Sequence, residues 1–243
     1  MTPKLLLPLS FALMAASPLF AEDTIDPKAK AILEKSVKAT GERAALDKIK
    51  SRISIGKVDL PAQGMTLTVE VKQKAPSFFY SKSVIPDIMT VEQGYDGKEG
   101  WSKDSIQGAR KLAGPELAQA KEGASMFMED QLLKDLVSAK LLDDSKEGDK
   151  TYSVVEAKSK DSNAKTLFFD QSTGLLAKIV TKLAVGPGGE MTAETKLSDY
   201  KEIDGVKIPF TMNIKAGPQN MVMKFSSIEH NKEIDDSIFK MKK

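Results

Sequence analysis

Few side chains in this sequence could catalyse a reaction. His230 is the only histidine, so a Ser-His-Asp triad would have to use it. It lies in SSIEHNKEI, at the polar end of an expected strand, where an exposed strand-end residue is the ordinary interpretation. One imidazole is also too few for a histidine-based zinc site. We therefore expect no catalytic histidine and no metal.

Carboxylates give no clearer signal of chemistry. The pairs Asp143-Asp144 and Asp235-Asp236 lie in polar turns without the spaced oxygen ligands and fixed glycine of a calcium loop. Glycoside hydrolysis needs two facing carboxylates, and nothing in the sequence places two on facing strands. GPGG at 186–189 lacks the Gly-Lys-Ser/Thr of a phosphate loop. We predict a protein that is not an enzyme and needs no cofactor, with a hydrolase carrying carboxylates in a hollow as the minor alternative.

The N-terminus has the pattern of an export signal. MTPKLLLPLSFALMAASPLFAED has one lysine, an apolar run from Leu5 to Ala16, and small residues before Ala21. The run is shorter than the roughly 20 residues of a spanning helix. We predict a cleaved signal peptide at 1–21 and a periplasmic mature chain at 22–243 that does not span a membrane. An uncleaved anchor is the alternative.

Composition narrows the classes of partner and site. The chain has no cysteine, which excludes disulfides, thiol nucleophiles, thiolate metal sites and a lipid-modified N-terminal cysteine. The net charge is +2 without a basic arm, so no nucleic-acid partner is expected. With 243 residues and 41% hydrophobic residues, one β-rich domain is plausible.

Local patterns predict the elements that must position any site. Asp26-Pro27 is typical of a helix start and Gly41 of its end, and a short second helix is expected at 42–49. From Ser51 apolar and polar residues alternate, as in half-buried strands. A helical period at about 113–142 interrupts the strands. We predict about 10–11 antiparallel strands in an α+β fold, forming an unclosed half-barrel whose concave face the helices cover.

GYDGKEGW at 94–101 contains the only tryptophan. Asp-Gly between β-like runs is a strong hairpin signal, because both central positions of a type I′ turn need positive φ. We therefore interpret Asp96 as a turn residue rather than a catalytic one, and place Trp101 on the returning strand.

Methionine and aromatic side chains gather on a few expected strand faces and on the helical insert. Methionine is flexible and is frequent on surfaces that accept varied apolar partners. These residues indicate either an apolar cavity for acyl chains or an ordinary core. The residues that we predict to contact lipid are Leu67, Val69, Val71, Phe79, Trp101, Met126, Phe127, Phe168, Met212, Ile214, Met221, Met223 and Phe225.

Five segments together resemble the LolA/LolB-like superfamily, and more closely the exported bacterial proteins described as outer-membrane lipoprotein-sorting proteins. They are KAPSFF (74–79), YDGKEGW (95–101), LFFDQSTGLLAKI (167–179), DYKEIDGVKIPF (199–210) and DDSIFKM (235–241). The resemblance implies an unclosed antiparallel β-barrel with helices across its mouth. It also implies a hollow that holds lipids or lipoprotein acyl chains, with Trp101 on the wall.

The resemblance has two departures. The lipoprotein carrier of the family has an arginine before the proline of its Lys-x-Pro strand, which helps hold the helical lid shut, whereas this chain has Ala75. The outer-membrane receptor of the system has an N-terminal cysteine, and this chain has none. A soluble carrier of lipid or lipoprotein acyl chains is the nearer analogue. The alternative is an envelope module that binds a protein partner or senses stress, with strand addition at an open sheet edge.

Overall fold

One antiparallel sheet of thirteen strands dominates the computed structural model, which describes residues 24–160, 163–184 and 190–241. The predicted signal peptide and the GPGG segment lie outside the described residues. The strands are β1 (Ser51–Leu60), β2 (Met65–Lys74), β3 (Phe78–Ile85), β4 (Met89–Tyr95), β5 (Gly100–Asp104), β6 (Gly108–Lys111), β7 (Leu136–Glu147), β8 (Lys150–Ser159), β9 (Lys165–Asp170), β10 (Leu176–Ala184), β11 (Glu190–Ile203), β12 (Val206–Ala216) and β13 (Gln219–His230).

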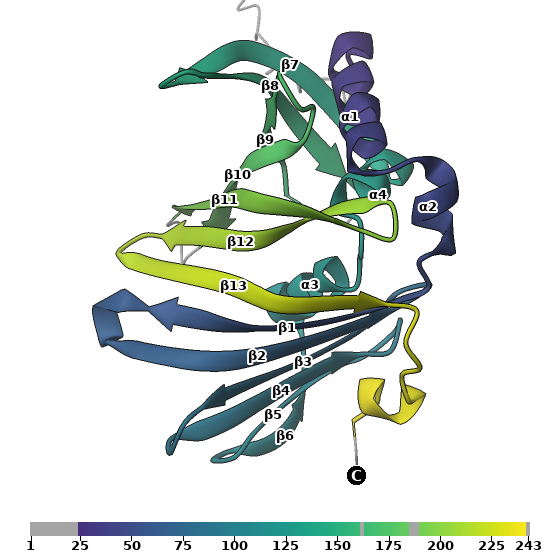
Figure 1. Ribbon diagram of the computed structural model, residues 1–243. Helices are drawn as coiled ribbons and strands as arrows, with labels where there is room; N and C mark the ends of the chain where they lie inside the picture. The colour runs from purple at the N-terminus through teal and green to yellow at the C-terminus, as the bar shows by residue number, and fades with distance from the viewer. Residues whose placement is uncertain (1–23, 161–162, 185–189, 242–243) are drawn as a thin grey trace, which may run out of the picture.

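The strand order is β6-β5-β4-β3-β2-β1-β13-β12-β11-β10-β9-β8-β7. Two meanders therefore meet where the first strand pairs with the last, and Arg52 of β1 stands opposite His230 of β13. The two halves diverge from this central pair (Figure 1). Strands β6 and β7 are the ends of the order, so the sheet is the predicted unclosed half-barrel.

The helices are α1 (Pro27–Thr40), α2 (Arg43–Lys48), α3 (Gly114–Gly123) and α4 (Met128–Lys134), with short 3-10 turns η1 (Pro61–Gln63) and η2 (Asp236–Phe239). The helix start predicted at Asp26-Pro27 is confirmed, because Asp26 Oδ1 accepts a hydrogen bond from the backbone N–H of Lys28 at 2.7 Å. Gly41 follows the last residue of α1, as predicted.

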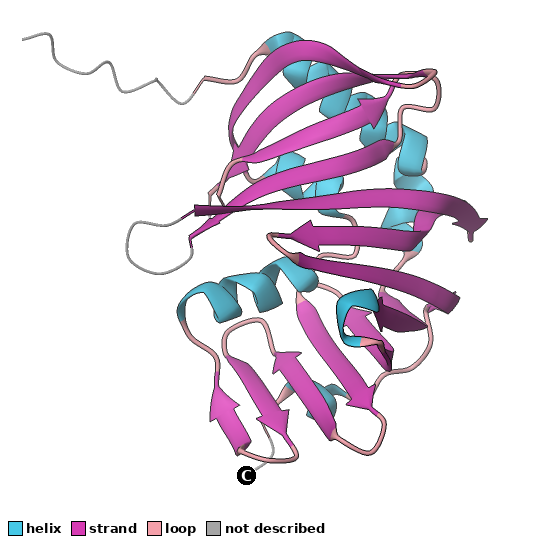
Figure 2. Cartoon of the chain, turned by 90° about the vertical axis from the view of Figure 1, so that its left-hand side faces the viewer, coloured by secondary structure: helices cyan, strands magenta, loops and turns pink. Residues whose placement is uncertain are grey.

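Helices cover the concave face of both halves. Leu33 of α1 and Leu132 of α4 pack with Leu167 and Phe169 of β9. In the other half, α3 contributes Ala120 to a cluster with Tyr95 of β4. In the upper half of Figure 2, the strands curve around the helices behind them. The middle of the concave face, between these two packed regions, lies beside the connection from α3 to α4.

The predicted strand count of 10–11 is corrected to thirteen by β6 and β7. The helical prediction for 113–142 is right only as far as Lys134, because Leu136–Glu147 is a strand. The sequence LVSAKLL is compatible with both the helical and the strand period. It forms a strand because it pairs with β8. β6 has four exposed residues, too few to show an alternating pattern.

Candidate functional site

A cavity of about 360 Å³ opens on the middle of the concave face. Strands β1–β3 and β10–β13 form its floor, and the segment Gly123–Glu129, from the last residue of α3 to the first turn of α4, forms its roof. Its size is in the range of small-ligand sites, which are mostly apolar with a few placed polar groups. The apolar side chains along it are Val71, Phe79, Met126, Phe127, Met128, Leu176, Ile179, Leu197, Ile208, Met212, Met223, Phe225 and Ile228.

Seven of the thirteen residues predicted to contact lipid line this cavity: Val71, Phe79, Met126, Phe127, Met212, Met223 and Phe225. Met212 and Met223 are direct partners across β12 and β13, so their side chains share one face. The roof brings Met126 and Phe127 over that face. The structure thus brings together residues from β2, β3, β12, β13 and the roof.

Four predicted residues continue the same strand face outside the cavity. Leu67 is paired with Val58, which is also paired with Met223. Val69 is paired with Gly56, opposite Phe225. Ile214 and Met221 are partners on β12 and β13. These side chains extend the apolar rows of the cavity along the concave face.

The remaining two, Trp101 and Phe168, lie on the opposite face. Trp101 packs with Tyr80, Ile234 and Phe239, and its Nε1 donates to the Phe239 carbonyl at 2.9 Å. The Lys178 ammonium lies 3.9 Å from the Phe168 ring centroid, while the adjacent Phe169 belongs to the core under the helices. Alternation assigns residues to two faces but does not say which is concave. We leave both residues out of the proposed contact surface.

The GYDGKEGW stretch is a hairpin, with β4 ending at Tyr95 and β5 beginning at Gly100. Asp96 is a turn residue, as predicted. Its Oδ1 accepts from the backbone N–H groups of Lys98 at 3.0 Å and Glu99 at 2.8 Å. Only Gly97 of the Asp-Gly pair has positive φ, so the turn is not the expected type I′.

Arg52 is the buried cation of the cavity, with 8% of its surface exposed. Its Nη1 donates to the Met126 carbonyl at 2.8 Å, and its Nε donates to His230 Nε2 at 3.3 Å. The guanidinium also lies 4.9 Å from the Phe127 ring centroid. Burial lowers the pKa of Arg52 to about 10, so the side chain remains cationic at neutral pH.

His230 connects Arg52 to the surface. Since Nε2 accepts from Arg52, the ring proton is assigned to Nδ1, which lies 3.1 Å from Asp204 Oδ2. Burial lowers the pKa of His230, and the charge of Arg52 adds to this effect. The imidazole is therefore neutral at pH 7 and accepts a hydrogen bond from Arg52 Nε.

Glu129 and Tyr200 lie at the same part of the cavity. Burial raises the pKa of Glu129, although Ser36 and Arg52 favour its ionised form. Tyr200 donates its hydroxyl to the Leu176 carbonyl at 2.6 Å, and burial raises its pKa. The cavity therefore combines long apolar walls with a small polar region.

Two side chains of the sheet hold the roof in place. Gln73 Nε2 donates to the Gly123 carbonyl at 2.6 Å and to the Ser125 carbonyl at 2.9 Å. Arg52 donates to Met126, as described above. Ala75 offers no side-chain donor for such a contact. The roof contacts thus come from neighbouring strands β1 and β2 rather than from the position before Pro76.

Sequence reasoning missed Arg52, Gln73, Glu129 and Tyr200. Arg52 and Gln73 are partners on β1 and β2 and lie in line with Ser54 and Val71. The sequence offered one signal for these two residues: a cation and an amide at strand positions whose neighbours face the concave side. Each occurs near a strand end, where charged and polar residues are common, so neither stood out.

A second cavity of about 460 Å³ lies on the other side of the roof. Ser125 and Met128 line both cavities. Ala124, Leu132 and the ion-paired Lys165 and Glu122 also border the second one. The roof segment is therefore a partition between two hollows.

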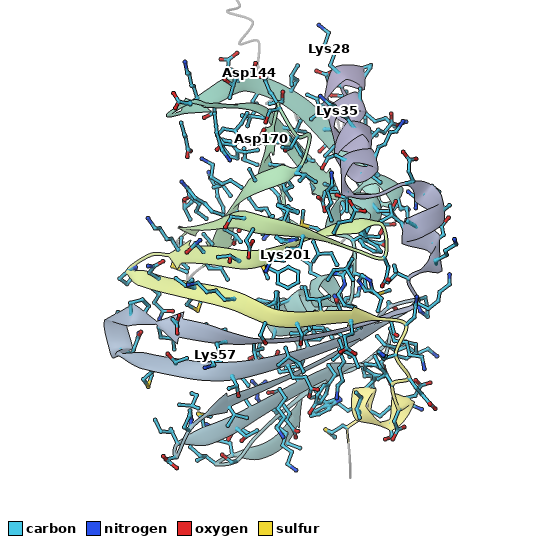
Figure 3. The ribbon with its side chains drawn as sticks, viewed as in Figure 1. Lys28, Lys35, Lys57, Asp144, Asp170 and Lys201 are labelled. Atoms are coloured by element: carbon cyan, nitrogen blue, oxygen red, sulfur yellow. The ribbon has the colours of Figure 1, made fainter. Side chains whose placement is uncertain are left out.

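Asp144, considered above as a candidate for chemistry, does not line the cavity, and neither does Asp170. Asp144 and Asp170 lie at the β7–β9 end of the sheet (Figure 3). Asp144 accepts from Gln171 at 2.8 Å, and Asp170 caps its turn by accepting from the Ser172 N–H at 2.9 Å. Among the described residues, no group of three or more histidine, cysteine, aspartate and glutamate side chains could hold a metal ion. In the same part of the chain, no helix is both long and apolar enough to cross a bilayer.

Comparison with known proteins identifies the fold. No protein-family model and no curated protein matches the sequence. Solved structures do match. A LolA superfamily protein from Nitrosomonas europaea has a TM-score of 0.59 at 16% identity, over 88% of this chain and 97% of that one. A DUF1329 family protein from Desulfovibrio piger has a TM-score of 0.60 at 12% identity, over 87% and 97%.

A third structure, described as a putative outer membrane lipoprotein-sorting protein domain from Vibrio parahaemolyticus, has a TM-score of 0.57 at 12% identity, over 87% of this chain and 96% of that one. These identities establish likeness of fold alone. The resemblance found in the sequence is confirmed at that level: the chain has the LolA-like fold.

Proposed function

We propose that this protein binds lipid or lipoprotein acyl chains in the periplasm and carries them without chemical change. The observation that supports this proposal best is the cavity of about 360 Å³ with Met212, Met223 and Phe225 on its floor and Met126 and Phe127 on its roof. Each methylene removed from water contributes about 0.8 kcal/mol, so an acyl chain gains affinity with its length. No covalent step is required.

Uptake of a fluorescent fatty acid tests this proposal. We expect saturable binding by the wild type. Met223→Gln should weaken it about threefold to tenfold, because the amide loses hydrogen bonds to water when the chain enters. Met89→Gln is the matched control, since Met89 lies on β4 and does not line the cavity, and it should bind as the wild type does. Absence of uptake by the wild type would contradict the proposal.

A protein-binding role is the second candidate. Its simplest form is strand addition at an open sheet edge, and both edges of this sheet have features that disfavour such pairing. β6 is short and carries Arg110 and Lys111, which are paired with Glu116 and Glu99. Short charged strands are how proteins protect an edge from pairing. On β7, Ala139 already exchanges backbone hydrogen bonds with Thr24 and Asp26. A stoichiometric protein partner recovered with an empty cavity would favour this second role.

A further inference from the structure

The cavity contains a charge that the contacts of its own chain do not satisfy. Arg52 Nη2 is buried and has no hydrogen-bond partner among the residues that the structure describes. Glu129 is near enough to act on Arg52, but no carboxylate among the described side chains forms an ion pair with the guanidinium. A buried cation is costly unless it is paired and hydrogen-bonded. If the pocket served only apolar packing, a neutral side chain in place of the guanidinium would pack as well.

The groups around Arg52 leave its positive charge in place. Burial, together with the charge of Arg52, lowers the pKa of His230, so its imidazole is neutral at pH 7. Glu129 is pushed towards its neutral form by burial. Tyr200 keeps its proton and donates it to a backbone carbonyl. Arg52 is therefore the buried cation at the polar end of a cavity with apolar walls.

We propose that Arg52 is the head-group site of this cavity, which takes a single-chain amphiphile with a compact anionic head, a carboxylate or a phosphate, in preference to a neutral one. Arginine donors suit both anions, and charge-assisted hydrogen bonds are roughly twice as strong as neutral ones. The chain of the ligand lies against Met212, Met223 and Phe225. This inference rests on the proposed function and names the ligand class of the same cavity.

Displacement of a neutral fluorescent probe from the full-length mature protein tests it, using palmitate and hexadecanol, which differ in the head and share the chain. We expect the wild type to bind palmitate about tenfold more tightly than hexadecanol. Arg52→Met should reduce this preference to about twofold or less while hexadecanol still binds, and Arg52→Lys should retain part of it. Because the preference is a ratio within one variant, it does not depend on how firmly the roof is held.

Lys207 provides the matched control, because it is the other cation that lines the cavity and its side chain is exposed. Lys207→Met should keep the palmitate preference. Hexadecyl phosphate separates the two anions: tighter binding than palmitate assigns a phosphate head, and weaker binding a carboxylate. Equal binding of palmitate and hexadecanol by the wild type would overturn the inference and leave the proposed function standing. The inference would also be overturned if Lys207→Met removed the preference for palmitate and Arg52→Met left it unchanged. Failure of all three ligands to bind would refute the proposed function itself.

Discussion

Gly94 and Trp101 are partners on β4 and β5, and the indole lies directly against the glycine. A Cβ atom at Gly94 would stand 2.3 Å from Trp101 Nε1, so the indole requires glycine at this partner position. The same Nε1 donates to the Phe239 carbonyl and fastens η2 to the convex face. Trp101 thus stabilises the C-terminal end rather than lining the cavity.

Gly94→Ala should therefore displace the indole and lower the free energy of unfolding by about 1–3 kcal/mol, the usual cost of overpacking. The measurement is urea unfolding followed by tryptophan fluorescence, which reports Trp101 alone because the chain has one tryptophan. The native emission should shift to longer wavelength as the ring gains water. An unchanged spectrum and midpoint would contradict this packing.

His230 makes stability depend on pH. Burial lowers its pKa in the folded chain below the ordinary 6.5, so the unfolded chain binds more protons between those two values. The free energy of unfolding therefore falls as the pH drops below about 6.5 and stops falling below the folded pKa. Protonation also removes the lone pair that accepts from Arg52.

The check is urea unfolding of the wild type and His230→Gln from pH 7.5 to 4.5. The difference between the two stabilities isolates His230 from the carboxylates that titrate in both proteins. We expect the wild type to lose stability relative to the variant as the pH falls through this window. Parallel curves would show that His230 does not titrate on unfolding as described.

At the scale of elements, the roof segment Gly123–Glu129 depends on few contacts. Two of its carbonyls accept from one side chain, Gln73. Gln73→Leu removes both donors, so the segment should open more often. We expect amide exchange of residues 123–127 to accelerate about tenfold, as for a loss near 1.4 kcal/mol, and bound fatty acid to dissociate faster.

Gln93→Leu is the matched control. Gln93 is paired with Ser81, which is paired with Val71, so it lies on the same face two strands from Gln73. The same chemical change there should leave exchange in the roof as it is in the wild type. Equal acceleration by both variants would mean that the roof responds to the sheet as a whole and not to the Gln73 contacts.

The elements also show what local sequence can and cannot predict. The Asp26 cap, the alternating strands and the Asp96 turn depend on neighbours in the chain, and all three are present in the structure. β7 depends on pairing with β8, and its helix-like spacing was therefore misleading. Trp101 and Phe168 were placed on the strands correctly, but which strand face becomes concave depends on where the helices pack.

The polar part of the site was the least predictable. Arg52, Glu129 and His230 are separated by more than seventy residues along the chain, and only the pairing of β1 with β13 and the docking of α4 bring them together. Apolar lining is easier to predict because methionine and phenylalanine recur at alternate positions. A buried charge has no such periodic signal.

At the scale of the whole molecule, the architecture separates stability from binding. Packed clusters under the helices occupy the two halves of the sheet, and the cavity lies between them at the junction of the two meanders. The helices that complete the core also supply its roof. A ligand in this place would contact both halves, and its stabilisation of the fold would grow with the logarithm of the ligand concentration divided by its Kd.

Native mass spectrometry of the protein purified from a periplasmic extract, followed by solvent extraction of what co-purifies, tests the central claim most directly. The account predicts one bound acyl-chain lipid per protein, with a mass that names its class. A mass equal to the bare chain, with no uptake of added fatty acid, would contradict the account and leave the methionine-lined cavity as a gap in the core.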